Sequence, residues 1–184
     1  MAVTFWVMSF LWGIASSLPH SLGLASTSLG NELTLWLGII TYVMGLLMET
    51  FADYQKWTWK QQNPGKFCGD GLWSLSQHPN FFGNFALWSG ITIMNLPALV
   101  DPIDMDNSSR VMRAVIALWS RHKAILALLS PVLLWLFFNG QARGDIGSGV
   151  EESLKRYGDD TDFQKYITTT PLLVPDLRRL YGNN

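Results

Sequence analysis

Four long apolar segments dominate the pattern of hydrophobic and polar positions along the chain. They run from about Thr4 to Leu24, from Leu33 to about Glu49, from Phe81 to Leu99, and less regularly from Val111 to Phe138. Each is close to the roughly 20 residues that an α-helix needs to cross about 30 Å of hydrocarbon. The pattern therefore predicts an all-α, multi-pass transmembrane domain with about four spans.

Two of these segments carry features that refine the prediction. The second is expected to continue as a helix past the membrane surface to Gln62, because no Gly or Pro intervenes before Asn63-Pro64-Gly65 stops it. The fourth is interrupted at Ser120–Lys123, which predicts an interfacial lead-in over 111–119 and a short span over 124–138. One membrane domain over 1–184 is expected, with its helices in 1–138 and a polar tail, 139–184, packing over a site.

Composition supports a membrane environment. Of the 184 residues, 48% are apolar and only 15% are charged, which is well below the usual quarter for a soluble protein. The net charge of −1 argues against a nucleic-acid partner, which requires a basic surface. The single cysteine, Cys68, excludes an internal disulfide and a zinc site built from several thiolates, and we interpret it as a loop thiol. No metal site is predicted.

Charge in the loops predicts an orientation. If the spans alternate, the acidic loop Asp101–Asn107 lies on one side of the membrane and most basic residues lie on the other. By the positive-inside rule the basic side faces the cytosol or its equivalent in an organelle, so an integral membrane protein of the endoplasmic reticulum, plastid or mitochondrion is expected. The residues on that side are Lys56, Lys60, Lys66, Arg143, Lys155, Arg156, Lys165, Arg178 and Arg179.

A charged stripe occupies the second helix. Glu49, Asp53, Lys56 and Lys60 are separated by 4, 3 and 4 residues, so at about 3.6 residues per turn they share one face. A ladder of salt bridges on a solvated helix end would account for the two lysines. It accounts less well for Glu49 at the membrane boundary, where a carboxylate usually faces a cavity or a ligand. We interpret Glu49 and Asp53 as site residues.

A polar cluster lies immediately before and within the third segment. Gln77, His78, Asn80 and Asn84 are expensive to bury unless a partner or ligand satisfies them. His78 is favoured as a site residue, whereas Asn80 and Asn84 could equally serve as a helix cap and as contacts between helices. His20 and His122 are interpreted as interfacial residues. The small residues of the spans are expected to be close-packing positions, namely Gly13, Gly38, Gly45, Gly83 and Gly90.

These blocks together carry a resemblance. The sequences Glu49-Thr-Phe-Ala-Asp53-Tyr-Gln55-Lys56, Gly71-Leu-Trp73, Ser76-Gln77-His78-Pro79-Asn80-Phe81-Phe82-Gly83 and Trp88-Ser-Gly90 resemble the C-terminal domain of the steroid 5-alpha-reductase family. The closer similarity is to its bacterial and algal branch of membrane reductases. Ser130-Pro131, Lys155-Arg-Tyr157-Gly158, Phe163-Gln-Lys-Tyr166 and Thr170-Pro171-Leu-Leu-Val-Pro175 follow the same order.

The resemblance implies a membrane reductase that passes hydride from NADPH to a carbon–carbon double bond of a lipid or sterol. Membrane lipids, a hydrophobic small-molecule substrate and other membrane subunits are the implied partners. No catalytic residue is assigned. The residues implied to bind the cofactor are Glu49, Asp53, Lys60, Trp73, Gln77, His78, Asn80, Phe81, Tyr157 and Tyr166.

Departures from the family pattern keep two alternatives open. Gln77 stands where the family has Arg, and Asn84 stands where it usually has Glu. Full-length relatives also begin with additional spans, so the segment starting at Met1 resembles an N-terminally shortened member. A non-catalytic subunit of a larger membrane complex is one alternative. The other is an S-adenosylmethionine-dependent methyltransferase of the isoprenylcysteine type, which shares the R-H-P-x-Y-F-G core.

Overall fold

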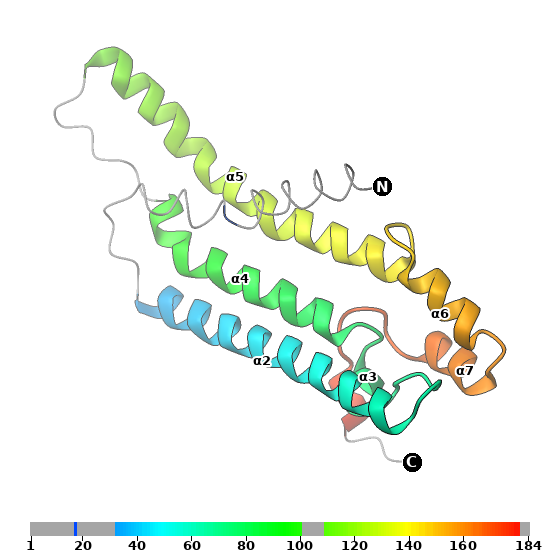
Figure 1. The fold of residues 1–184 in the computed structure, drawn as a ribbon. Helices are drawn as coiled ribbons and strands as arrows, with labels where there is room; N and C mark the ends of the chain where they lie inside the picture. The colour runs from blue at the N-terminus through cyan, green and yellow to red at the C-terminus, as the bar shows by residue number, and fades with distance from the viewer. Residues whose placement is uncertain (1–16, 18–31, 101–108, 181–184) are drawn as a thin grey trace. The chain divides into compact units, whose positions relative to one another are not determined.

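Helices joined by short loops make up the part of the chain that a computed structural model describes, which comprises residues 17, 32–100 and 109–180 (Figure 1). These residues form six α-helices and a short 3-10 helix, and no strand occurs among them. The predicted all-α class is therefore confirmed for this part. The helices are α2 (Glu32–Gln62), α3 (Leu72–Leu75), α4 (Pro79–Val100), α5 (Arg110–Arg143), α6 (Gly149–Tyr157), α7 (Thr161–Thr169) and η1 (Leu177–Leu180).

The chain divides into two compact units, each built from two stretches of sequence. Unit 1 comprises Met1–Val43 and Leu87–Trp135, and unit 2 comprises Met44–Ala86 and Leu136–Asn184. The polar cluster predicted from the sequence and the polar tail both belong to unit 2.

Helix α2 carries an exposed apolar stripe along its length. Leu33, Trp36, Ile40, Met44 and Leu47 recur three or four residues apart, and the exposed fraction of each lies between 44% and 64%. Among the described helices, α2 is the one long and apolar enough to cross a membrane. The prediction of about four spans is thus not confirmed, and its first span, Thr4–Leu24, lies outside the described residues together with the acidic loop.

Helix α2 ends where the sequence predicts. It continues to Gln62, and the backbone N–H of Asn63 closes its last turn on the Trp59 carbonyl at 2.8 Å. Pro64 cannot continue the helix, and Gly65 adopts a φ of 83°, a left-handed conformation that glycine accepts without steric cost.

Helix α5 covers the fourth segment as one element. The apolar pattern is interrupted at Ser120–Lys123, but the helix is continuous from Arg110 to Arg143. The interfacial lead-in over 111–119 and the short span over 124–138 stay predictions. Polarity does not itself interrupt the backbone hydrogen bonds of a helix, and arginine and lysine are good helix formers. The polar residues therefore change what the helix surface can contact, and they leave the secondary structure intact.

In unit 1, α2 and α4 approach closely at glycine. A methyl group on Gly90 would lie 2.5 Å from the Tyr42 backbone nitrogen and 2.7 Å from the Gly38 carbonyl oxygen. These distances leave no room for any side chain. The predicted close-packing role is confirmed for Gly38 and Gly90, in agreement with the use of small residues where membrane helices meet.

In unit 2, the same two helices meet at Gly83. A methyl group there would lie 2.6 Å from the Glu49 nitrogen and 2.8 Å from the Gly45 carbonyl oxygen. Beside this crossing lies a core of Ala52, Cys68 and Trp73, which are 0%, 6% and 3% exposed. Cys68 is in a loop, as predicted, but its side chain is part of the core.

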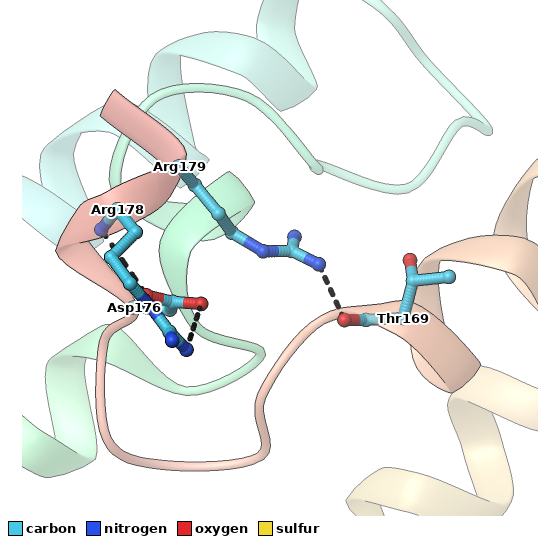
Figure 2. Close-up of polar contacts among 4 residues, drawn as sticks. All are labelled: Thr169, Asp176, Arg178 and Arg179. Atoms are coloured by element: carbon cyan, nitrogen blue, oxygen red, sulfur yellow. Dashed lines mark hydrogen bonds and ion pairs between the residues drawn. The ribbon is translucent and has the colours of Figure 1, made fainter. Parts of the chain in front are cut away.

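Hydrogen bonds to backbone carbonyls connect the C-terminal segment of unit 2 to the end of α3. The buried Ser76 hydroxyl donates to the Leu173 carbonyl at 2.8 Å, and the Asp176 N–H donates to the Leu75 carbonyl at 3.0 Å. Figure 2 shows Arg178 folded back on Asp176, at 2.9 Å, while Arg179 reaches the Thr169 carbonyl. These bonds hold the segment after α7 against the loop that begins α4.

Candidate functional site

A cavity of about 650 Å³ lies within unit 2. Its lining comes from one face of the C-terminal half of α2, from the 67–81 region, and from α6, α7 and the loop before α6. This volume falls within the range of small-molecule sites in proteins. The charged and aromatic residues that line it are Lys56, Lys60, Phe67, Trp73, His78, Phe81, Glu152, Arg156, Tyr157, Phe163 and Tyr166.

The two lysines of the charged stripe face this cavity. The Lys56 ammonium lies 4.2 Å from the centre of the Trp73 ring, and Lys60 donates to the Tyr157 hydroxyl and, at 2.6 Å, to the Lys66 carbonyl. No ion pair joins these lysines to Glu49 or Asp53, although all four residues are described. The salt-bridge ladder is therefore the wrong interpretation, because each lysine has a partner across the site.

The two acidic residues of the stripe turn instead toward α4. Glu49 accepts a hydrogen bond from the Asn84 side chain at 2.7 Å, and Asp53 accepts one from Asn80 at 3.0 Å. Neither acid lines the cavity, whereas Asn80 does. The Asn80 Oδ1 atom is buried and has no hydrogen-bond partner in the described part of the chain. Asp53 thus orients an amide whose acceptor atom is buried without a partner.

His78 and Phe81 form one aromatic wall of the cavity. Their rings stack with centroids 4.9 Å apart and planes 6° apart, and Phe81 in turn stacks on Phe138 at 5.1 Å. Burial, followed by the nearby Lys56 charge, lowers the pKa of His78 to about 4, although a hydrogen bond with the Ala142 backbone opposes this. The imidazole is therefore neutral at physiological pH.

This shift predicts acid sensitivity. The unfolded chain takes up a proton on His78 near its ordinary pKa of 6.5, but the folded chain does so only near 4. Stability contributed by neutral His78 should therefore be complete above about pH 6.5 and should be lost as the pH falls to about 4, with a loss of about 3 kcal/mol. Urea unfolding of wild type and His78→Gln between pH 7 and 4 should show a shallower pH dependence in the variant. Parallel pH profiles would contradict the assignment.

Gln77 and Tyr166 line the cavity, but their polar side-chain groups donate hydrogen bonds to backbone carbonyls of the protein. The Gln77 amide donates to the Ile167 and Thr170 carbonyls at 2.9 and 2.6 Å, and the Tyr166 hydroxyl donates to the Trp73 carbonyl at 2.8 Å. Both side chains therefore fix α7 against the α3 region. The arginine-to-glutamine departure at position 77 leaves a residue whose contacts are with the tail.

Several lining residues are not among the site residues that the sequence predicts. Lys56 is expected only on the charged stripe, Arg156 only among the basic residues of one membrane side and in the block before Gly158, and the loop Ile146–Gly149 carries no prediction. The spacing of Lys56, one turn before Lys60, was a usable signal for the first. For Arg156 the usable signal was its place directly before Tyr157, whereas the loop carries no such signal.

The structure gathers eight of the ten predicted site residues around the cavity, namely Lys60, Trp73, Gln77, His78, Asn80, Phe81, Tyr157 and Tyr166. Glu49 and Asp53 stand behind it on the α2–α4 contact. That these residues hold a cofactor stays a prediction.

Comparison with known proteins adds a family. The model of the family described as Protein of unknown function (DUF1295) matches residues 1–105, more than half of the chain. The chain belongs to the DUF1295 family. The part matching DUF1295 includes α2, α3 and α4, and with them the lining residues from Lys56 to Phe81. No curated protein and no solved structure matches the chain.

Proposed function

We propose that this protein is a multi-pass membrane reductase that binds NADPH in the unit 2 cavity and reduces a carbon–carbon double bond of a lipid or sterol-like substrate. The single observation that carries the proposal is the cavity itself, in which cations and aromatic faces converge. Similarity of the motifs to the steroid 5-alpha-reductase family supplies the reaction class. Membership in DUF1295 and the apolar helix α2 are consistent with a protein of an organelle or endoplasmic reticulum membrane.

Charge in the cavity favours an anionic ligand. Lys56, Lys60 and Arg156 line it, opposed by the single carboxylate of Glu152, which accepts a hydrogen bond from Ser148 at 3.0 Å. The α6 N-terminus adds to this, since Ser148 and Gly149 line the cavity and no side chain caps the helix. Phosphate groups are bound in proteins by cations and by uncapped helix N-termini.

The remaining lining fits the rest of a nicotinamide dinucleotide. Trp73, the His78–Phe81 stack and Tyr157 offer flat surfaces for planar rings. Asn80 and Gln77 also line the cavity and add amide groups to its polar wall. Ile146, Val150 and Ile167 supply apolar area for a hydrophobic substrate. When bound, NADPH would supply the hydride.

The same charge disfavours the methyltransferase alternative. S-Adenosylmethionine carries a sulfonium cation, and three cationic side chains against one carboxylate would repel it. We therefore expect NADPH, and not S-adenosylmethionine, to raise the midpoint of thermal unfolding of the detergent-solubilised protein, because a ligand bound only by the folded state stabilises it.

A matched pair of substitutions on α6 tests the proposed site. Arg156→Ala should weaken NADPH binding by roughly ten- to a hundredfold, because a charge-assisted hydrogen bond contributes about 1.5–3 kcal/mol. Lys155→Ala is the control, since Lys155 is its neighbour on the same helix but is exposed and pairs with Glu151 at 2.6 Å. Titration of NADPH against intrinsic tryptophan fluorescence measures both. Equal affinity in the two variants, or no binding to the wild type, would refute the proposed site.

One group of hydrogen bonds favours the non-catalytic alternative. The Gln77 amide nitrogen donates to two backbone carbonyls, and asparagine side chains donate to both acids of the stripe, so part of the polar cluster serves packing. A structural subunit would leave thermal stability unchanged with either ligand and would copurify with other membrane subunits in stoichiometric amounts.

A further inference from the structure

Tyr157 is almost completely buried and yet contributes to the lining of the cavity. It is the last residue of α6 and is only 9% exposed. Its ring packs against Phe67 and Phe163, with centroids 6.4 and 5.6 Å away, so its position is fixed from two sides. Yet the residue lines the cavity. A phenol is thus held rigidly at the edge of the proposed binding site.

Two cations flank the phenol. The Lys60 ammonium donates a hydrogen bond to its oxygen and lies 4.6 Å from the ring centre, and the Arg156 guanidinium carbon lies 6.0 Å from the same ring centre. An ammonium cannot accept a hydrogen bond, so the bond from Lys60 uses a lone pair of the phenol oxygen. The hydroxyl's own proton finds no acceptor among the residues that the structure describes. It is therefore available to a ligand in the cavity.

The surrounding charges favour loss of that proton. Burial alone would raise the pKa of Tyr157, but the hydrogen bonds and positive charges of Lys60 and Arg156 together hold it below its ordinary value. Lys56 adds a further positive charge from α2, whereas Glu152 on α6 is the acidic side chain of the cavity wall. The net field therefore stabilises a phenolate, which makes the phenol a stronger acid than free tyrosine.

We propose that Tyr157 is the proton donor of the reaction, with Lys60 and Arg156 as the residues that position and polarise it. This inference rests on the proposed reductase function. In the reduction of an α,β-unsaturated ketone, hydride and its electron pair go to the β-carbon, and the carbon–carbon π electrons shift toward the carbonyl. The O–H bond of Tyr157 breaks as its proton passes to the carbonyl oxygen. The enol tautomerises to the saturated ketone, and the phenolate recovers a proton from water.

The first test needs no substrate. Titration of the detergent-solubilised protein by tyrosinate absorbance should show one phenol that ionises below the others. That phase should vanish in Tyr157→Phe, which keeps the ring in place, and should move to higher pH in Lys60→Met. Tyr54→Phe is the control, because Tyr54 is 62% exposed and does not line the cavity, and should leave the early phase unchanged. An early phase that persists in Tyr157→Phe would overturn the proposal.

The second test separates this inference from the proposed function. NADPH oxidation with cyclohex-2-enone as the probe should fall by at least about a hundredfold in kcat in Tyr157→Phe, while NADPH still raises the melting temperature as in the wild type. A variant with the wild-type rate, or a wild type that binds NADPH but does not reduce the enone, would overturn Tyr157 as the acid while NADPH binding stands. A wild type not stabilised by NADPH would defeat the proposed function, and this inference with it.

Discussion

Replacing Trp73 with alanine should lower the midpoint of thermal unfolding in detergent by an amount on the order of 10 °C. The side chain is 3% exposed, belongs to the core with Ala52 and Cys68, and donates from Nε1 to the Ala52 carbonyl at 2.9 Å. Truncation of a buried tryptophan costs about 3–5 kcal/mol, since it leaves a cavity, and here it also removes the hydrogen bond to the Ala52 carbonyl. The ring beneath Lys56 would be lost as well, so NADPH affinity should fall with stability.

Two further variants make this result specific. Trp57→Ala removes the same side chain from a position that is 61% exposed on the same helix as Ala52, and should shift the midpoint far less. Trp73→Phe keeps a ring beneath Lys56 but cannot donate to Ala52, so an intermediate loss is expected. If Trp73→Ala were no more damaging than Trp57→Ala, the core described for unit 2 would be wrong.

Gly83→Ala should destabilise the protein by about 2 kcal/mol or more. In a helix, alanine is ordinarily preferred over glycine by about 1 kcal/mol, so propensity alone predicts stabilisation. The added methyl group would instead lie 2.6 and 2.8 Å from backbone atoms of Glu49 and Gly45, and a helix backbone cannot rotate away as a side chain can. The helices must separate, which would also stretch the hydrogen bond from Asn84 to Glu49.

The sign of the change in unfolding free energy shows whether helix propensity or the steric clash at Gly83 dominates. Gly149→Ala is the matched control, because a methyl group on Gly149, the first residue of α6, meets nothing within 4 Å. It should be neutral or stabilising. Chemical unfolding of both variants in the same detergent gives the two free energies. A stabilised Gly83→Ala protein would show that α2 and α4 do not approach as described.

Local patterns predicted the helical class and some helix ends correctly. Periodic apolar positions, and the stop at Asn63-Pro64-Gly65, act through the backbone of a few neighbouring residues, so they can be evaluated without the fold. The polar interruption at Ser120–Lys123 leaves α5 continuous, so the hydropathy pattern there did not give the length of the helix. The four spans were inferred from hydropathy alone, and among the described helices α2 alone meets the length and hydropathy criterion.

The candidate site was only partly predictable. The sequence identified the stripe and the polar cluster as unusual, since uncompensated polar groups beside apolar segments require partners. It could not say which partners they have. Lys60 and Tyr157 meet across nearly a hundred positions of sequence, as do Gln77 and α7.

The amino-acid sequence by itself determined that the described part of the chain is helical, where α2 ends, that Gly38, Gly83 and Gly90 allow close packing, and which polar residues need explanation. Gly13 lies outside the described residues. Only the tertiary structure showed that the charged stripe has two sets of partners. Its two acids accept hydrogen bonds from asparagines of α4, and its two lysines line the cavity. The tertiary structure also showed that Arg156 and Tyr157 join those lysines. The physical reason is that helix periodicity fixes only which side chains share a face, whereas a side chain's partner depends on the packing of segments distant in sequence.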